Sequence, residues 1–291
     1  MIASFPNFSS IDLSMRKELH PRLSMLKAGI SEFTFANLYL FRENYKYEVS
    51  SLPDESIAIK GQSEGKTFLM FPCGIPEKSV FKELMSGTDY IKALSVEHTE
   101  ESRIFLEQNG YTVREDRDNF DYLYLRKDLV HLAGRKYHKK RNQIHAFINN
   151  YNYEEKRLCD GCETDAMNVL EKWVEGRDDR GDYKAAKEGL EIAHDLNLRG
   201  AVFYVNGEPA GYSLGEGLAR GKMFAVHFEK AIGNYKGIYQ FINKSFAKML
   251  PGHYHHINRE QDLGDPGLRQ AKMSYRPCGF VKKYKIVPRE V

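Results

Sequence analysis

The sequence predicts an α+β protein made of two halves, each with a mixed central sheet flanked by helices. Two observations carry this prediction. The chain has 291 residues, about twice the ~150 of a usual domain. In both halves, patterns typical of strands and of amphipathic helices follow one another in a similar order. The alternative is a single mixed sheet that extends through the whole chain.

Composition sets the outer limits on function. Hydrophobic residues make up 42% of the chain and aromatic residues 12%, which excludes disorder over the whole length. No apolar run approaches the ~20 residues of a membrane-spanning helix, and the first residues do not resemble a secretory signal. With four cysteines and no export signal, we expect a soluble protein in the reducing cytoplasm. A net charge of +3 is too small to indicate nucleic acid or membrane by itself.

The first half begins with segments that look like strands. Residues 34–41 and 47–49 are aromatic and β-branched. Residues 56–60 and 67–71 flank a glycine-containing turn and predict a hairpin. Helices are expected after Pro76 and after Thr99, a candidate N-cap. The remaining predicted strands are 90–96 and 120–125.

The second half repeats this order. Apolar residues at helical spacing predict helices at 166–174 and 238–250, with another near 185–195. Asn206-Gly207 lies between apolar alternations, the strongest short signal for a hairpin. A short helix is expected at 267–275. The strands of this half are predicted at 153–158, 201–205, 210–214, 222–228, 254–258 and 280–287.

This order of strand, helices, hairpin, helix, strand, helix and strand resembles the Gcn5-related N-acetyltransferase (GNAT) fold, here in tandem. We expect an N-terminal GNAT-like domain at 1–128, a basic connecting helix at 129–150 and a C-terminal GNAT-like domain at 151–291. The loop around Cys73 in the first half shows no cluster of chemically active side chains. The first domain is therefore expected to be a scaffold and the second to hold the active site.

The connecting helix carries the densest positive charge in the chain. Its basic residues are Arg135, Lys136, His138, Lys139, Lys140 and Arg141. One interpretation is a solvated helix. The other is a surface that faces the phosphates of tRNA or an anionic headgroup, where each cation releases counterions and binding depends on salt. Tyr137 and His138 add rings that can stack on bases.

A second cluster mixes both signs of charge after the predicted strand at 254–258. Its polar members are Asn258, Arg259, Glu260, Asp262, Asp265, Arg269, Lys272 and Tyr275. Ligands often bind where strands end in α/β folds. A carboxylate in such a group can hold an ammonium while an arginine holds a carboxyl or a phosphate. The alternative is a capped, salt-bridged surface loop.

The third candidate is the strand-to-helix loop at 229–240, which contributes Glu229, Lys236, Tyr239 and Gln240. In a GNAT protein this loop offers backbone amides and a helix dipole to a pyrophosphate. The usual glycine pattern is missing, and Tyr239 stands where a small residue is expected. Coenzyme A is therefore a weaker expectation, although Lys236 can hold a single phosphate.

No metal is expected. Cys159 and Cys162 have metal-ligand spacing, but a zinc site needs a second pair of ligands and none is nearby.

Three motifs together resemble the family that includes the C-terminal catalytic domain of phosphatidylglycerol lysyltransferases. They are Phe120–Tyr124 with Leu132–Asn142, Asn234–Gln240, and Ile257–Gly264 with Gly267–Tyr275. The resemblance covers nearly the whole chain and implies a tandem GNAT fold, similar also to peptidyltransferases that build cell-wall cross-bridges. In the lysyltransferases an aminoacyl-tRNA donates its amino acid to a lipid hydroxyl. The present sequence lacks their membrane-spanning part, which leaves the acceptor open among a lipid headgroup, a peptide and a small molecule.

The expected activity is therefore acyl or aminoacyl transfer to a hydroxyl or amine. Glu260 and Asp262 would bind the donor's ammonium, and Arg259 or Arg269 an oxyanion or phosphate. Asp262 or Tyr275 would move protons, and Tyr239 and Gln240 would shape the pocket. The alternatives are an acyl-coenzyme A-dependent N-acetyltransferase and a non-catalytic module that binds an amino acid or an anion. Aminoacyl-tRNA or acyl-coenzyme A is a donor substrate here, and no resident cofactor is required.

Overall fold

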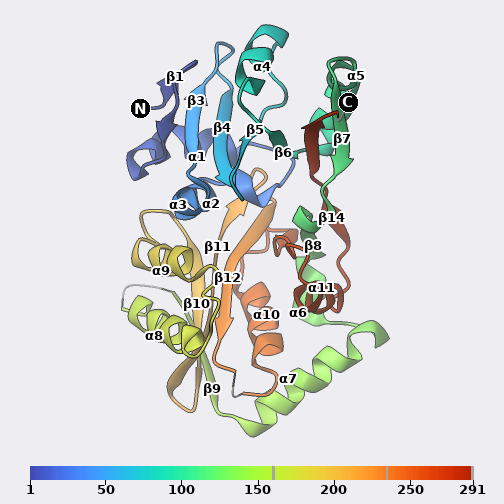
Figure 1. Cartoon of the computed structure of the whole chain (residues 1–291). Coiled ribbons are helices and arrows are strands. Elements are labelled where there is room, and N and C mark those ends of the chain that lie inside the picture. Colours follow the sequence, from blue (N-terminus) through green and yellow to red (C-terminus); the bar gives the residue numbers. More distant parts are fainter. Residues whose placement is uncertain (159–160, 234, 290–291) are drawn as a thin grey trace. The chain divides into compact units, whose positions relative to one another are not determined.

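The computed structural model describes residues 1–158, 161–233 and 235–289 (Figure 1). The chain forms two compact units, and each unit is discontinuous in sequence. Unit 1 consists of Met1–Asp121, Gln261–Pro266 and Phe280–Val291, and unit 2 of Tyr122–Glu260 and Gly267–Gly279. Each unit is built around one mixed sheet, which confirms the predicted α+β class.

The sheet of unit 1 has the order β1-β3-β4-β5-β6-β15-β7, and β2 also pairs with β3. Its strands are β1 (Ala3–Ser4), β2 (Ser9–Ser10), β3 (Glu48–Ser51), β4 (Ile57–Ser63), β5 (Lys66–Met70), β6 (Tyr90–Leu94), β7 (Tyr111–Glu115) and β15 (Tyr284–Pro288). Its helices are α1 (Arg16–Ser24), α2 (Phe35–Leu40), α3 (Arg42–Tyr45), α4 (Lys78–Met85) and α5 (Val96–Gln108). Helices α4 and α5 share a core with the sheet through buried residues such as Phe81, Leu106 and Ile286.

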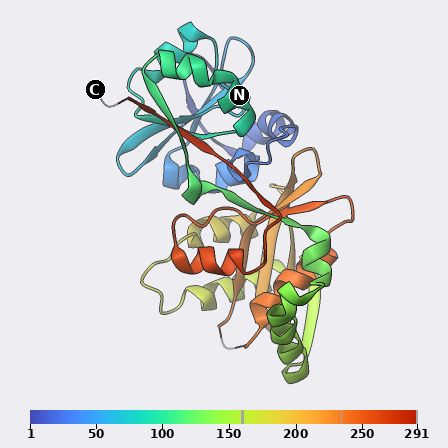
Figure 2. The same cartoon turned by 90° about the vertical axis from the view of Figure 1, so that its right-hand side faces the viewer.

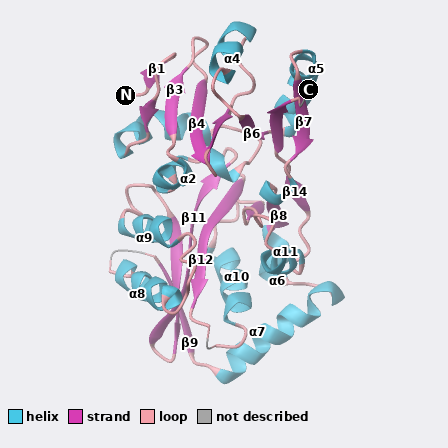
Figure 3. Ribbon diagram, viewed as in Figure 1, coloured by secondary structure: helices cyan, strands magenta, loops and turns pink. Residues whose placement is uncertain are grey.

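The sheet of unit 2 has the order β14-β8-β13-β12-β11-β10-β9. Its strands are β8 (Asp121–Leu125), β9 (Tyr153–Arg157), β10 (Arg199–Val205), β11 (Glu208–Leu218), β12 (Met223–Ala231), β13 (His256–Asn258) and β14 (Gly279–Val281). Its helices are α6 (Arg126–His131), α7 (His138–Asn150), α8 (Glu163–Val174), α9 (Tyr183–Glu191), α10 (Ile238–Met249) and α11 (Pro266–Met273). Helices α8 and α9 lie on one side of this sheet, and α10 lies on the other with α6 and α7 (Figure 3).

The two halves of the chain exchange their closing strands. The strand predicted at 120–125 is β8, which pairs with β13 in the sheet of unit 2. The segment predicted as one strand at 280–287 is divided between β14 and β15, and β15 lies between β6 and β7 in unit 1. Figure 2 shows this dark red strand running through the blue-to-green unit. The units therefore differ from the contiguous ranges 1–128 and 151–291, because strand pairing is non-local.

A buried ion cluster holds the segment before β15 in unit 1. The ammonium of Lys283 contacts Asp121 Oδ1 at 2.6 Å and also contacts Glu32, and all three side chains are buried. Ser31 donates its backbone N–H and its hydroxyl to Asp121 at 2.9 and 3.0 Å. Buried charges persist only when paired, so this cluster fixes the C-terminal segment against the N-terminal half of the chain.

Two local predictions in unit 1 are wrong. Residues 34–41, predicted as a strand, form the helix α2, because the Thr34 hydroxyl caps it by accepting the N–H of Asn37 at 3.1 Å. Most of this helix is buried, so no polar face reveals the helical period. Thr99 is not an N-cap. Helix α5 begins earlier, at Val96, and the Ser95 hydroxyl caps it by accepting the N–H of His98.

Candidate functional site

A β-bulge in the centre of the unit 2 sheet sets the geometry of the candidate site. Leu214 pairs with Phe228 and Gly215 pairs with Val226, which leaves His227 as the extra residue on β12. A β-carbon on Gly215 would lie 1.9 Å from the carbonyl oxygen of Ala225. Only glycine permits this close approach of β11 and β12. Bulges of this kind re-aim a side chain, often next to an active site.

Replacing Gly215 by alanine will separate the two strands at the bulge. We expect the free energy of unfolding to fall by at least about 2 kcal/mol, measured by urea titration of the full chain. Gly252→Ala is the matched control, because no atom lies within 4 Å of the added carbon there. Equal stability of the two variants would contradict the close approach.

His227 lies between two carboxylates. Its Nδ1 is 2.8 Å from Glu260 Oε1 and its Nε2 is 3.2 Å from Glu216 Oε1. Burial alone would lower the pKa of this imidazole, but the hydrogen bonds to Glu216 and Glu260 raise it to about 10. His227 is therefore an imidazolium at neutral pH, and it neutralises part of the charge of the two glutamates.

Glu260 is held rigidly by its own backbone. The residue adopts a left-handed conformation with φ of +53°, which is uncommon for a non-glycine residue. Its N–H donates to Asn258 Oδ1 at 2.7 Å, and its carbonyl oxygen accepts from Lys272 Nζ at 3.1 Å. The side chain of Glu260 keeps 17% of its surface exposed, whereas that of His227 keeps 1%. Glu260 can therefore contact a ligand while His227 positions it.

Arg259 and Glu229 form a largely buried ion pair in unit 2. Arg259 Nη2 donates to Glu229 Oε1 at 2.7 Å, and their side chains are 15% and 10% exposed. Burial would lower the pKa of Arg259, but the charge of Glu229 raises it. The guanidinium carbon also lies 5.5 Å from the ring centroid of Tyr275. Burial raises the pKa of Tyr275, so this side chain remains a neutral phenol at neutral pH.

Lys140 brings the basic helix α7 to this cluster. Its Nζ lies 4.0 Å from the ring centroid of Tyr275. Burial, together with the positive charges of Arg259 and Lys139, lowers the pKa of Lys140 to about 8. Two cations thus approach one aromatic ring in unit 2. An anionic ligand group would relieve their repulsion.

The amine of Lys140 will react with acylating reagents faster than the exposed amine of Lys139. At pH 8 about half of the Lys140 side chains are expected to be neutral, in contrast to well under one per cent for an ordinary lysine. Competitive labelling with acetic anhydride across pH 6–11, followed by peptide mass spectrometry, reports an apparent pKa for each amine. Identical profiles for the two lysines would contradict the assigned environment.

Several expected site residues therefore converge in unit 2. Gln240 is hydrogen-bonded to Tyr275. This bond and the contacts above join Lys140, Glu229, Gln240, Asn258, Arg259, Glu260, Lys272 and Tyr275. The network rests on the bulge of β12, the end of β13 and the helices α7, α10 and α11. His227 and Glu216 belong to it but were not among the candidates.

The contacts described for Asp262 are with residues of unit 1. It belongs to unit 1, its side chain is fully buried, and Arg117 Nη1 lies 3.3 Å from its Oδ2. Its Oδ1 also accepts the N–H of Gly264 at 3.0 Å. The buried carboxylate of Asp262 thus pairs with the partly exposed Arg117 and accepts a hydrogen bond within its own loop, and its role in proton transfer stays a prediction.

The remaining candidates lie in the loop before α10, on α10 and α11, and in the basic segment that leads into α7. Lys236 is exposed in the loop before α10, and Arg269 is half-buried on α11. The Tyr239 hydroxyl donates to the Ala231 carbonyl at 3.3 Å. In the basic segment, Arg141 Nη1 donates to the carbonyls of Leu132 and Gly134 at 2.6 and 2.7 Å, while Arg135, Lys136, His138 and Lys139 are exposed.

Neither a metal site nor a membrane span is found in the described ranges. Within residues 1–158, 161–233 and 235–289, no three His, Cys, Asp or Glu side chains are placed to share a metal ion. Cys159 of the predicted cysteine pair and Asn234 of the loop motif lie outside these ranges. None of the helices described is both long enough and apolar enough to cross a bilayer.

Comparison with known proteins gives a family and a fold. The family model described as "Phosphatidylglycerol lysyltransferase, C-terminal" matches residues 23–287. An uncharacterized protein of Mycoplasmoides gallisepticum is 26% identical over 188 residues, which are 60% of this chain and 57% of that protein. This chain thus matches less than two thirds of that relative's length.

Solved structures agree with the tandem GNAT prediction. A conserved protein of unknown function from Bacteroides thetaiotaomicron has a TM-score of 0.87 and 28% identity, with 99% of this chain and all of that chain covered. The C-terminal domain of a putative lysylphosphatidylglycerol synthetase from Agrobacterium fabrum has a TM-score of 0.67 and 13% identity, covering 95% and 92%. A tandem GNAT protein of clavulanic acid biosynthesis has a TM-score of 0.50 and 7% identity, covering 98% and 99%.

Proposed function

The chain belongs to the phosphatidylglycerol lysyltransferase C-terminal family, and on that premise we propose that unit 2 transfers an aminoacyl group from an aminoacyl-tRNA to a hydroxyl or amine acceptor. The family and fold are those of acyl and aminoacyl transferases. The observation that carries the proposal is that two cations, Arg259 and Lys140, approach the buried ring of Tyr275, while the residue after Arg259, Glu260, keeps a partly exposed side chain held by His227. Donor tRNA also implies a cytoplasmic location.

Each part of the donor has a matching group in unit 2. The carboxylate of Glu260 binds the α-ammonium of the amino acid, and His227 and Glu216 keep it oriented. Lys140 and Arg259 face the negative charge that develops on the ester oxygens, where a preorganised cation acts most strongly in a water-poor site. Outside the cluster, the exposed cations Arg135, Lys136 and Lys139 bind tRNA phosphates.

The bonds that form and break in the transfer step belong to the donor and the acceptor. The acceptor oxygen or nitrogen attacks the ester carbonyl carbon, the new C–O or C–N bond forms, and the bond to the tRNA ribose oxygen breaks. The acceptor's proton ends on that ribose oxygen. The neutral fraction of Lys140 accepts the acceptor's proton as the new bond forms, and in this protonated form it faces the ester oxygens. Lys140 then passes the proton to the ribose oxygen as its bond breaks, while Tyr275, which stays protonated, donates a hydrogen bond to that oxygen.

Binding of tRNA will be strongly dependent on salt. Three or four phosphate contacts predict that the logarithm of the binding constant falls by about 2 to 4 per decade of salt concentration. Filter binding of bulk aminoacyl-tRNA to the full chain measures this slope. Lys139→Gln is expected to reduce the slope by about 1, whereas Lys184→Gln on α9, also exposed, is the matched control. No binding at about 50 mM salt would reject this donor.

The transfer assay separates the proposal from its alternatives. Full-length protein is incubated with tRNA charged with labelled amino acids and with phosphatidylglycerol vesicles, peptides or small amines as acceptors. Label in an acceptor, lost in Glu260→Gln, supports aminoacyl transfer. Binding of tRNA without transfer to any acceptor favours a binding module. Stabilisation by acetyl-coenzyme A, about 2.7 kcal/mol at 100 times its dissociation constant, favours an N-acetyltransferase.

A further inference from the structure

Unit 1 contains a pocket that is separate from the site described in unit 2. Its volume is about 390 Å³, within the range of small-molecule sites. The floor is a row of side chains from three neighbouring strands, Glu48 on β3, Lys60 on β4 and Leu69 on β5, which are paired in register. The sequence suggested that this half of the protein is only a scaffold.

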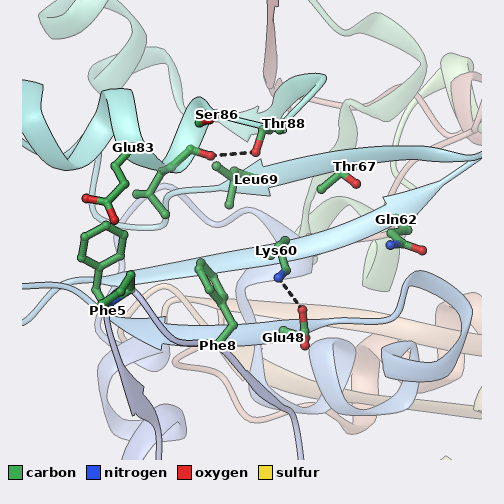
Figure 4. Close-up of a pocket in the computed structure, with 13 residues that line it drawn as sticks. Phe5, Phe8, Glu48, Lys60, Gln62, Thr67, Leu69, Glu83, Ser86 and Thr88 are labelled. Atoms are coloured by element: carbon green, nitrogen blue, oxygen red, sulfur yellow. Dashed lines mark hydrogen bonds and ion pairs between the residues drawn. The ribbon is translucent and has the colours of Figure 1, made fainter.

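Two phenylalanine rings form a wall of the pocket. Phe5 and Phe8 come from the segment between β1 and β2, and both also pack against the core of unit 1. Across from them, the pocket is closed by the last turn of α4, with Glu83, and by the turn that follows the helix. Figure 4 shows the side chain of Glu83 extending from α4 toward the ring of Phe5.

The charge of the lining favours a cation. The described lining holds two carboxylates, of Glu48 and Glu83, against one ammonium, that of Lys60. Lys60 Nζ is 2.7 Å from Glu48 Oε2, so these two charges compensate each other and Glu83 adds a further negative charge. The C-terminal end of α4 also lies at the pocket, and a helix C-terminus carries partial negative charge.

The lysine of the floor shows how this pocket accommodates an ammonium. Lys60 Nζ lies 4.6 Å from the ring centroid of Phe8 while it is paired with Glu48. This is the geometry of a cation–π contact combined with an ion pair. Phe5 and Glu83 offer the same combination of ring and carboxylate where α4 faces the wall of phenylalanines (Figure 4).

We propose that the pocket of unit 1 binds a small organic cation that has an apolar body. The ammonium lies between the carboxylate of Glu83 and the ring of Phe5, and the apolar body rests on Phe8 and on the buried side chains of Leu69 and Leu84. An anionic ligand of the same size would meet two carboxylates, and a neutral one would leave Glu83 without a compensating charge.

A matched pair of probes tests the charge requirement on the full chain. Tryptamine carries an ammonium at neutral pH, and tryptophol replaces it by a neutral hydroxyl on the same indole body. Titration calorimetry is expected to show tryptamine binding about tenfold tighter than tryptophol. Equal affinity of the two probes, or no binding of tryptamine up to about 10 mM, overturns the proposal.

Variants and methyl NMR place the bound probe. Glu83→Gln, at an exposed position on α4, is expected to weaken the binding of tryptamine about fivefold or more and to leave the binding of tryptophol unchanged. Glu101→Gln on α5, also exposed, is the control. Phe5→Leu removes one ring and is expected to weaken the binding of both probes.

Methyl NMR locates the bound probe, because tryptamine must shift the methyl signals of Leu69 and Leu84. Shifts confined to other residues, or an unchanged affinity in Glu83→Gln, also overturn the proposal. Neither transfer activity nor tRNA is needed for this test.

Discussion

Replacing Arg259 by alanine will abolish transfer and lower the free energy of unfolding by about 3–5 kcal/mol. The change leaves the carboxylate of Glu229, which is 10% exposed, without its 2.7 Å partner. A buried charge deprived of its counter-ion is one of the few causes of so large a loss. Urea unfolding of the full chain measures the stability, and labelled aminoacyl-tRNA measures transfer.

A double variant separates the two effects. Arg259→Met combined with Glu229→Leu replaces the ion pair by apolar side chains of similar size, an exchange that is often neutral or stabilising. We expect stability close to that of the unchanged protein but no transfer, because the cation is gone. The labelling profile of Lys140 must also move toward the usual lysine pKa, since Arg259 contributes to lowering it. Transfer activity in the double variant would show that Arg259 is not part of the proposed site.

Residues 1–128 will not fold as an isolated fragment, although the sequence predicts a domain there. The fragment lacks β15, which lies between β6 and β7, and with it the fully buried Ile286. It also lacks Lys283, so Glu32 and Asp121 would be buried without the ammonium that contacts both of them. We expect no cooperative thermal transition and little strand signal in far-UV circular dichroism.

Restoring the missing segment provides the control. Residues 280–291 joined to residues 1–121 through a flexible glycine–serine linker supply β15 and Lys283 again, and this fragment is expected to unfold cooperatively. The same fragment with Lys283→Met is expected to remain unfolded, because it restores the strand but not the charge. Cooperative unfolding of residues 1–128 alone would show that β15 is dispensable.

The sequence predicted elements whose signals are local. The hairpin of β10 and β11 followed from Asn206-Gly207, and α8 and α10 followed from apolar residues at helical spacing. The helix α2 was missed because burial on most sides leaves no amphipathic pattern. The strand exchange was missed because the residues of β8 and β15 specify a strand but not its partner.

The same distinction applies to the candidate site. Arg259, Glu260 and Tyr275 lie close together in sequence, so their cluster was visible in advance. His227 lies between Val226 and Phe228 on β12, and Glu216 lies between two glycines on β11. Their importance emerges only from the distances that join His227 to Glu216 and to Glu260. A usable signal existed nonetheless. A charged residue inside a strand that is expected to be buried requires a partner.

The position of β15 has a consequence for how the protein is made. At about 5–20 residues per second, a ribosome needs roughly 10–30 s to advance from β8 to β15. During that time β6 and β7 have been synthesised but have no strand between them. The first unit to emerge is therefore the last to be completed. Its strand edges stay unpaired during this interval, which makes the nascent unit prone to aggregation unless chaperones protect it.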